Sequence, residues 1–359
     1  MTHTALAIIG AGLSGLTAAR IAHEAGITPR VLEAADRIGG RVDTVRSAEG
    51  RALGDLGPTW VWPPFQPGVP RWLEYLGLGT FEQYETGDAV LDGFADGPVR
   101  QPLPGQYGMA RIVGGPGALV EAMAANLPEG IIETGKAVTR IRRTDSGPLQ
   151  LEGAGWPPVI ADRVLLATPL RVISERIALP DTLDARLIDA LQATPAWMAA
   201  QAKAVIRYDR PFWREAGLSG RIASRNGPLF EAHDHTTSEG DAALFGFIGT
   251  PPEQRDPEPL QAAIIAQLAR CLGPKASAPT EIVVRDWASE PWICAEADRN
   301  GPPAHPSVGP DRLRTGHLDG RLWLCSAETA DQSPGLIEGA LLAGETAARA
   351  AIQHIRSAA

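Results

Sequence analysis

The chain has 359 residues, of which 44% are hydrophobic and 21% charged, and its formal net charge at pH 7 is −9. This length and apolar content suffice for a large buried core, in two domains or in one elaborate domain. The acidic balance argues against a nucleic-acid partner, because a basic binding face would leave an even more acidic remainder.

The cysteines, the first residues and the hydropathy of the sequence indicate in which cellular compartment the protein is expected. Cys271, Cys294 and Cys325 are too few and too scattered for a disulfide framework or a metal cluster, which fits a reducing cytoplasmic location. Residues 1–4 lack a basic stretch and lead directly into a strand, so we expect no signal peptide. No run of ~18 apolar residues occurs, so we expect no contact with a membrane.

Residues 5–41 read as a strand, a glycine turn, a helix and a second strand. The apolar run at 5–9 has strand length, and a helix is expected to begin near Leu13 and Ser14. Three glycines have G-x-G-x-x-G spacing: Gly10 and Gly12 lie between the strand and the helix, and Gly15 lies in the first turn of the helix. In that order they permit a tight turn, close approach of a pyrophosphate to the backbone, and close packing of the helix on the strand.

The second strand is expected at 28–32 and ends at Glu33. A carboxylate at this place can accept hydrogen bonds from both ribose hydroxyls, and it would repel a 2′-phosphate. The start of the preceding helix would direct free N–H groups and the positive end of its dipole at the phosphates. The stretch therefore predicts a dinucleotide-binding unit.

Two further features follow before residue 110. After a polar strand at 41–46, a glycine-bracketed turn at 54–62 ends in tryptophans. Such a turn suits a backbone pressed against a flat ring, and it also suits an ordinary turn with core tryptophans. Residues 63–108 are rich in proline and glycine, with one plausible helix at 71–78.

The middle of the chain predicts a helix and two strands. The helix is expected over 112–125, and a strand at 137–141 would place Val138 and Ile141 on different faces of a sheet. The run at 163–169 is apolar enough for a strand covered on both sides, and its final proline ends the ladder.

The pattern E-x-x-x-R-x-G-G-R at 33–41 resembles the flavin-binding opening of the glutathione-reductase-like and amine oxidase families. Six later stretches resemble, in family order, segments of the flavin-containing monoamine and polyamine oxidases, so the resemblance covers nearly the whole chain. They are 114–119, 138–141, 165–169, 203–213, 286–292 and 322–340.

This resemblance implies FAD as cofactor. Cys294 stands near the region where some relatives bond covalently to flavin, but its register is two residues off, so we expect noncovalent FAD. A helix beginning near Gly335 would stabilise the negative charge that collects on flavin when it takes a hydride. The residues expected to bind the cofactor are Gly10, Gly12, Leu13, Ser14, Gly15, Glu33, Ala34, Arg37, Gly39, Gly40, Arg41, Gly57, Pro58, Thr59, Trp60, Val138, Ala167, Thr168, Trp287, Glu328, Gly335, Leu336 and Ile337.

Lys203 is the candidate catalytic residue. It lies in the apolar strand Ala202 to Ile206, where a lysine is out of place unless its ammonium reaches a polar cavity or water. In the family that this chain resembles, a lysine at this place holds a water near the flavin. The alternative is a lysine at a strand edge whose ammonium extends to solvent.

The sequence departs from the family pattern in two ways. Monoamine oxidases commonly place two aromatic residues before the flavin, whereas this chain has Leu336 at one of those places and no aromatic after Cys294 at the other. Trp60, Trp62 or Trp292 would then line the substrate pocket together with Leu336. The second departure is length, because the segment that roofs the pocket is short. Either the pocket is open, or a neighbouring subunit in a homodimer closes it.

Acids and histidines offer weaker candidates. Asp55 and Glu231 are the acids we would nominate for recognition of a cationic substrate. His233 and His235 form an H-x-H pair, but no third ligand is convincingly placed, so we expect no metal.

Taken together, the sequence predicts an α/β fold: a glutathione-reductase-like, Rossmann-like FAD-binding domain with an interleaved, smaller α+β substrate domain. We expect the FAD domain at 1–64, 112–192 and 294–359, and the substrate domain at 65–111 and 193–293.

The favoured function is an FAD-dependent oxidase for a small-molecule amine, with hydride transfer to flavin, hydrolysis of the imine, and O2 as acceptor. The first alternative is an FAD-dependent dehydrogenase, desaturase or isomerase for a non-amine substrate. The second is a noncatalytic FAD-binding protein that holds a partner.

Overall fold

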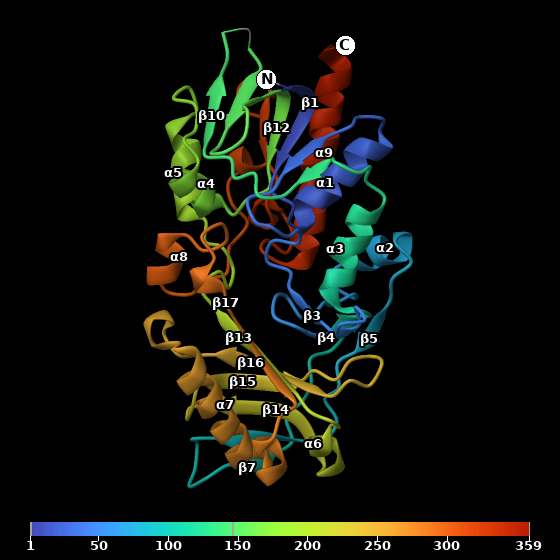
Figure 1. The fold of residues 1–359 in the computed structure, drawn as a ribbon, viewed down its shortest axis with the longest axis vertical. Helices are drawn as coiled ribbons and strands as arrows, with labels where there is room; N and C mark the ends of the chain where they lie inside the picture. The colour runs from blue at the N-terminus through green and yellow to red at the C-terminus, as the bar shows by residue number, and fades with distance from the viewer. Residues whose placement is uncertain (1, 146, 359) are drawn as a thin grey trace.

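Two seven-stranded sheets stand at opposite ends of the molecule in the computed structural model, which describes residues 2–145 and 147–358 (Figure 1). The first sheet lies beside both termini, and the second lies at the far end. The chain crosses between the two ends several times, so each sheet contains strands from separate parts of the sequence.

The first sheet has the order β10-β11-β12-β1-β2-β9, with β18 paired to β12. Its central strands, β1 and β12, run parallel from Thr2↔Val159 to Ile9↔Leu166. Its strands are β1 (Thr2–Ile9), β2 (Arg30–Leu32), β9 (Ile132–Glu133), β10 (Arg140–Arg143), β11 (Leu149–Glu152), β12 (Val159–Leu166) and β18 (Leu322–Leu324).

Helices cover both faces of this sheet, as the two core clusters show. Leu6 and Ile8 of β1 pack with α1, α3 and α9, whereas Ala7 and Ile9 pack with α4 and α5. Because both faces are buried there, residues 6–9 of this strand read as a continuous apolar run and show no alternation. These helices are α1 (Leu13–Glu24), α3 (Gly115–Ala125), α4 (Leu170–Arg176), α5 (Ala185–Ala193) and α9 (Ile337–Ala358).

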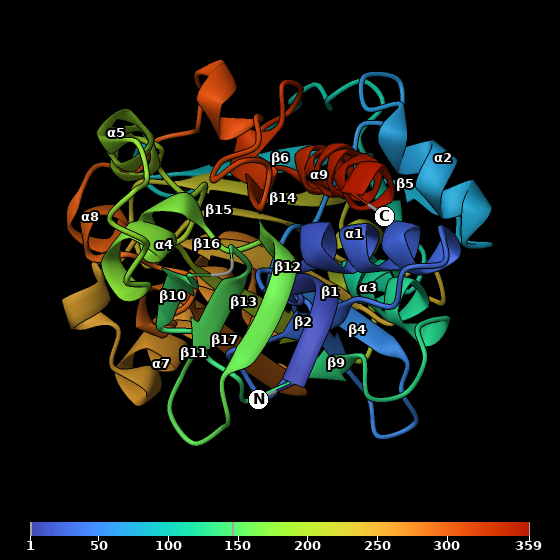
Figure 2. The same ribbon diagram turned by 90° about the horizontal axis from the view of Figure 1, so that it is seen from above.

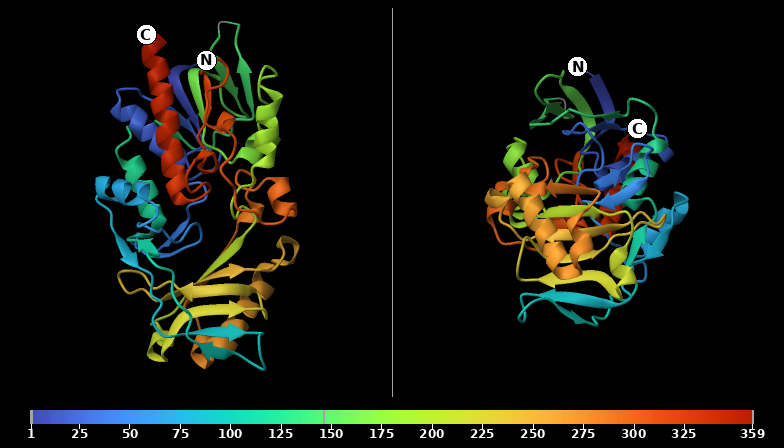
Figure 3. Two further views of the ribbon diagram at one scale, coloured as in Figure 1. Left: turned by 180° about the vertical axis from the view of Figure 1, so that it is seen from behind. Right: turned by 60° about the horizontal axis from the view of Figure 1, so that its bottom comes forward.

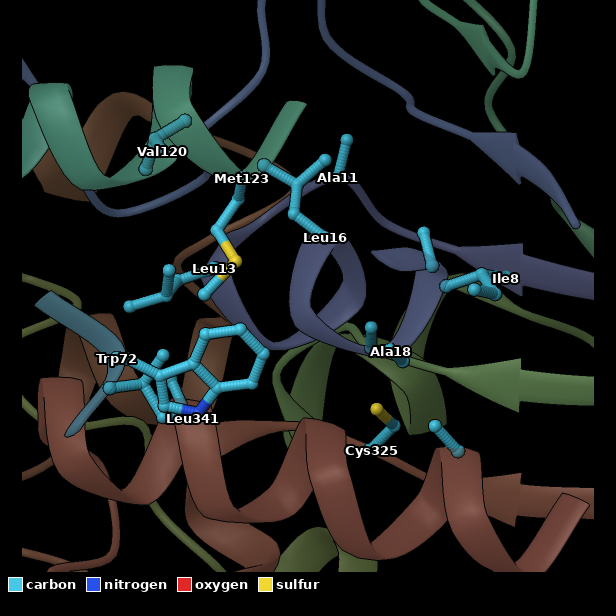
Figure 4. Close-up of a cluster of buried hydrophobic side chains, with 14 of the residues drawn as sticks. Ile8, Ala11, Leu13, Leu16, Ala18, Trp72, Val120, Met123, Cys325 and Leu341 are labelled. Carbon is cyan, nitrogen blue, oxygen red and sulfur yellow. The ribbon is translucent and has the colours of Figure 1, made fainter. Parts of the chain in front are cut away.

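Helices α1 and α9 lie side by side on one face (Figure 2). Leu16 and Ala18 of α1, Met123 of α3 and Leu341 of α9 fill the space between these helices (Figure 4). Trp72 of α2 (Gly68–Tyr75) closes this cluster from the side.

The second sheet has the order β17-β13-β16-β15-β14-β6-β7. Its central pairs are antiparallel, whereas β14 and β6 run parallel. Its strands are β6 (Asp88–Asp92), β7 (Val99–Gln101), β13 (Ala202–Arg207), β14 (Leu218–Ser224), β15 (Leu229–Asp234), β16 (Ala243–Ile248) and β17 (Glu281–Asp286).

The two faces of the second sheet have different partners. Ala204 and Ile206 of β13 pack with α7 (Pro257–Leu272), which lies across one face (Figure 3). Val205, one position away, joins Phe245, Phe247 and Leu56 on the other face. That face looks toward the first sheet, and by the period of two it is also the face of Lys203.

The remaining elements are shorter. They are β3 (Thr44–Arg46), β4 (Ala52–Asp55), β5 (Thr80–Glu82), β8 (Ala110–Ile112), α6 (Phe212–Glu215), α8 (Glu296–Asn300) and the 3-10 turns Pro252–Gln254, Pro274–Ser277, Trp287–Ser289, Asp311–Leu313 and Ala327–Thr329. Within the described ranges, no helix has the length and apolarity that crossing a bilayer requires.

Several predicted elements have different bounds in the structure; the helix expected over 112–125, for example, is found at Gly115–Ala125, and Ile112 belongs to β8. Two of the differences concern residues 68–78 and 137–143. The helix predicted at 71–78 begins at Gly68 instead, because the Glu338 carboxylate accepts hydrogen bonds from the N–H groups of Gly68 and Val69, both at 2.8 Å. The strand predicted at 137–141 is found at Arg140–Arg143. The period of two therefore does not extend to Val138, and Val138 and Ile141 share one core cluster; the prediction of opposite faces was wrong.

Candidate active site

A cavity of about 630 Å³ extends from the carboxyl end of β1 to β13 of the second sheet. Most of the side chains and glycines that the sequence nominated line it. Those residues are Gly10, Gly12, Leu13, Ser14, Glu33, Ala34, Arg37, Gly39, Gly40, Arg41, Gly57, Pro58, Thr59, Trp60, Trp62, Val138, Ala167, Thr168, Lys203, Trp287, Trp292, Gly335, Leu336 and Ile337. Gly15 and Glu328 are not among the lining residues.

The three glycines of the first turn meet different surroundings. Gly10 has φ +105°, and a Cβ there would lie 2.8 Å from the Ala167 carbonyl oxygen. A Cβ on Gly15 would lie 2.0 Å from the Gly10 carbonyl oxygen, so this glycine lets α1 pack on the turn and does not face the cavity. A Cβ on Gly12 would meet only Gly40 Cα, at 3.9 Å. The space in front of Gly12 is therefore open for a ligand.

Glu33 is held in place by backbone donors. Its Oε2 accepts from the N–H of Ala11 at 2.6 Å, and its Oε1 accepts from the N–H of Ala35 at 2.8 Å. The side chain is buried, yet it lines the cavity. A carboxylate fixed in this way retains lone pairs for the hydroxyl groups of a ribose.

The second glycine turn is tied together by two arginines. Arg37 donates to the carbonyl oxygens of Gly40 and Val42, both at 2.9 Å, and so closes the turn. Arg41 donates to both carboxylate oxygens of Glu328, at 2.5 and 3.1 Å. Glu328 is fully buried, so it supports Arg41 from behind and does not face the cavity.

Two buried hydroxyl groups at the cavity have no hydrogen-bond partner in the described part of the chain. They are Thr59 Oγ1 and Ser326 Oγ. Unpartnered buried hydroxyls are costly, and a polar ligand in the cavity would satisfy them. Together with the open space at Gly12 and the fixed Glu33, these atoms fit a dinucleotide such as FAD.

Lys203 ends the cavity on the side of the second sheet. Its side chain is buried, and its Nζ donates to the Gly57 carbonyl oxygen at 2.5 Å. The ammonium lies 5.6 Å from the ring centre of Phe247 and 5.9 Å from that of Phe245. Burial lowers the pKa of Lys203 to about 7, although the nearby Asp55 acts in the opposite direction. This lysine can therefore hold or release a proton near neutral pH.

Aromatic rings form the walls beside Lys203. Trp60 packs against Phe245 and Phe247, with ring centres 5.6 and 6.1 Å apart, and its indole N–H donates to Gln83. Trp287 donates to the Leu56 carbonyl oxygen at 2.8 Å. These hydrogen bonds satisfy the indole groups, so the rings present apolar faces to the cavity.

The other nominated residues lie elsewhere. Asp55 is buried, accepts from Thr44 Oγ1 at 2.7 Å and lies 3.3 Å from His235 Nε2; it does not line the cavity. Glu231 forms a 2.8 Å contact with His233 and is likewise outside the lining. Among the described residues, no group of three acids, histidines or cysteines could hold a metal ion.

Several lining residues were not nominated from the sequence. They include Trp197, Met198, Phe247, Glu290, His305 and Ser326. Ser326 follows a buried strand beside the nominated Glu328, so its position was a usable signal. Trp197 and His305 lie in loops without a motif, and only the tertiary structure brings them to the cavity.

Comparisons with known proteins agree with this geometry. The family model described as flavin containing amine oxidoreductase matches residues 94–352, and that of an NAD(P)-binding Rossmann-like domain matches residues 8–76. The chain is 25% identical to a putrescine oxidase of Kocuria rosea over 469 aligned positions, covering 95% of this chain and 93% of that protein. It is 26% identical to a probable flavin-containing monoamine oxidase A of Dictyostelium discoideum, covering 65% of this chain but only about half (51%) of the relative.

A solved structure shows the same fold. Cyclohexylamine oxidase from Brevibacterium oxydans superposes with a TM-score of 0.83 at 19% identity, covering 98% of this chain and 99% of the other. The predicted Rossmann-like α/β fold is thereby confirmed. The family-model match confirms FAD as the cofactor. Because the family model matches well over half of its length, the chain belongs to the flavin-containing amine oxidoreductases.

Proposed function

We propose that this protein oxidises the C–N bond of a small amine, with FAD held noncovalently in the cavity and O2 as the electron acceptor. One observation carries the proposal: a single cavity joins the glycine turn at Gly12 to the buried Lys203. When bound there, FAD would supply the hydride acceptor.

The two proposed domains correspond to the two sheets. We propose that the FAD-binding domain comprises 1–64, 112–192 and 294–359, and the substrate domain 65–111 and 193–293. In support, the described strands of the second sheet all come from 88–101 and 202–286. Helix α2 packs against α9, which covers the first sheet, so the early part of 65–111 is anchored on the FAD side.

The residues around Lys203 favour a neutral amine. Trp60, Phe247 and Leu336 line the cavity with apolar surface, and an apolar environment disfavours an ammonium ion. An amine that enters uncharged needs no strong general base. Lys203, with its pKa near 7, would then exchange a proton or hold a water beside the reacting atoms.

Noncovalent attachment is supported by the position of Cys294. Its side chain is buried and is absent from the cavity lining, and burial raises the pKa of its thiol to about 11. A protonated thiol is a poor nucleophile. Cys271 and Cys325 are also free and buried, which supports the proposed cytoplasmic location.

The test is a screen of FAD-loaded protein against amines and non-amines under anaerobic conditions. We expect amines to bleach the flavin absorbance, and O2 to restore it with release of peroxide. Bleaching only by non-amines would favour a dehydrogenase or desaturase. A flavin that no compound bleaches would favour a noncatalytic role.

A further inference from the structure

Two lining residues outside every sequence motif, Trp197 and His305, pack against each other at the cavity. Their ring centres are 4.8 Å apart and their planes are tilted by 58°. Trp197 lies in the loop between α5 and β13, and His305 lies in the coil that follows α8. Trp197 is half-buried and His305 is exposed, so the pair stands where the cavity reaches the surface.

This ring pair lies next to the start of α9. Gly335 has φ +78°, and a Cβ there would meet Trp197 Cβ at 3.1 Å and Pro306 Cγ at 2.9 Å. The two loops therefore pack directly on the residue before Leu336, which lines the cavity. Leu336 itself offers no flat surface, and the two rings supply one beside it.

The backbone beside Trp197 is held in an unusual conformation. Met198 has φ +56°, a value in the left-handed region that residues with a side chain rarely adopt. Such backbone persists only where its surroundings hold it, often at functional sites. Here Ala196 and Ala199 pack on Cys294, while Met198 joins the cluster of Phe247. This turn directs both Trp197 and Met198 to the cavity wall.

The charges of the cavity lining disfavour a substrate with two ammonium groups. Of the acids among the described lining residues, Glu33 and Asp36 belong to the dinucleotide end, and Glu290 is paired with Arg285 at 2.8 Å. Lys203 adds a cation when protonated, and the surrounding rings are apolar. Outside the dinucleotide end, a diamine would therefore find no unpaired carboxylate among the described lining residues, whereas an apolar ring would find a matching surface.

We propose that Trp197 and His305 form a subsite that selects amines bearing a flat, apolar group of ring size. The inference rests on the proposed amine oxidation, because it names the class of amine that this activity takes. Trp197 supplies the ring against which the substrate ring packs, and the exposed His305 packs on Trp197 and helps to hold it in place.

The test uses two amines that bind without reacting. Cumylamine is tert-butylamine with one methyl group replaced by phenyl, and neither carries hydrogen on the carbon beside nitrogen. Their dissociation constants are measured by the change in flavin absorbance of the holoenzyme. We expect the wild type to bind cumylamine at least ~10-fold more tightly than tert-butylamine. Trp197→Ala should weaken the binding of cumylamine by roughly 10-fold and that of tert-butylamine by less than about 3-fold.

A matched control is available in the same chain. His354 packs on Trp323 with ring centres 5.7 Å apart and a tilt of 56°, and it lies outside the cavity lining. His305→Ala should weaken the binding of cumylamine several-fold, whereas His354→Ala should leave the dissociation constants of both amines unchanged. Trp197→Phe keeps a ring and should give an intermediate constant, which provides a second variant if Trp197→Ala fails to fold.

The outcomes separate the subsite from the proposed function. The subsite is refuted if the wild type does not favour cumylamine, or if Trp197→Ala changes both constants equally or neither. If the constants behave as expected but no oxidisable amine bleaches the flavin, the amine-oxidation proposal fails and the ring subsite stands.

Discussion

The two ends of the cavity are constructed in different ways. At the dinucleotide end, the lining comes largely from one stretch, 9–42, and consists of glycine turns, backbone N–H groups and the fixed Glu33. At the other end, single side chains converge from distant parts of the chain, such as Trp60, Lys203 and His305. The first end is suited to a constant cofactor, whereas the second can vary one residue at a time with the substrate.

The largest predicted effect is that of Gly15→Ala, a change in the first glycine turn that should affect folding and not only cofactor binding. Gly15→Ala should destabilise the protein by several kcal/mol, roughly 3 or more, because its Cβ would lie 2.0 Å from a backbone oxygen. Thermal unfolding of the protein without FAD measures this loss.

Gly12→Ala is the matched control for that experiment. Its Cβ meets nothing closer than 3.9 Å, so the apoprotein should unfold at nearly the wild-type temperature. Because the added methyl group projects into the ligand space, FAD affinity should fall by roughly 10-fold or more. Equal loss of apoprotein stability in both variants would show that the two glycines do not have separate roles.

The next effect concerns Glu338, which links the start of α9 to α2. Glu338→Ala removes the acceptor of two buried N–H groups, Gly68 and Val69, and should lower the free energy of unfolding by about 2–4 kcal/mol. Chemical denaturation measures this change. Glu338→Gln keeps one acceptor oxygen and should lose about half as much. If both variants match the wild type, Glu338 does not anchor α2.

The contrast between the two ends also explains what sequence could predict. The turn at Gly10 to Gly15 and the acid at Glu33 follow local rules, so their spacing predicted both the fold and the cavity surface. Glu328 shows the limit of such rules, because a partner 287 positions away, Arg41, occupies both of its oxygens. The helix at Gly68 was misplaced for the same reason, since its capping carboxylate lies 270 positions away on α9.

The site at the second sheet was only partly predictable. Lys203 was detectable because a charge interrupts an apolar strand. Trp197 and His305 come from loops whose sequences carry no periodicity, and their contact depends on how α5, α8 and α9 pack. Tertiary packing of this kind has no local signal in one sequence.

A smaller effect tests the buried ammonium at Lys203. Its pKa is lowered to about 7 from the ordinary value of 10.5, so between these two pH values the unfolded chain binds more protons than the folded protein. The free energy of unfolding should therefore rise, through this group, as pH increases from 7 toward 10.5. Below pH 7 the buried ammonium destabilises the folded protein to its full extent.

Lys203→Met removes that dependence. Relative to the wild type, the variant should be most stable below pH 7, and its advantage should shrink toward pH 10.5. Chemical denaturation across this pH range measures the difference in free energy of unfolding between the variant and the wild type. A difference that does not change with pH would contradict the low pKa. Flavin reduction or reoxidation should also be slower in this variant while the yellow colour is retained, and unchanged rates would assign Lys203 a packing role.

The smallest expected effect is that of Cys294→Ala. Because this thiol is buried and lies outside the cavity lining, FAD content should not change. Intact-mass measurement of denatured wild type and variant should show no attached flavin in either. A flavin adduct on the wild type that disappears in the variant would contradict noncovalent binding.

The most direct test of the central claim is a titration of the purified, FAD-free protein with FAD, followed by visible absorbance. We predict a stoichiometric change from the spectrum of free FAD to that of a bound flavin, because separate stretches of the chain form one cavity for it. A spectrum that remains that of free FAD at every ratio, with a folded protein, would contradict the account.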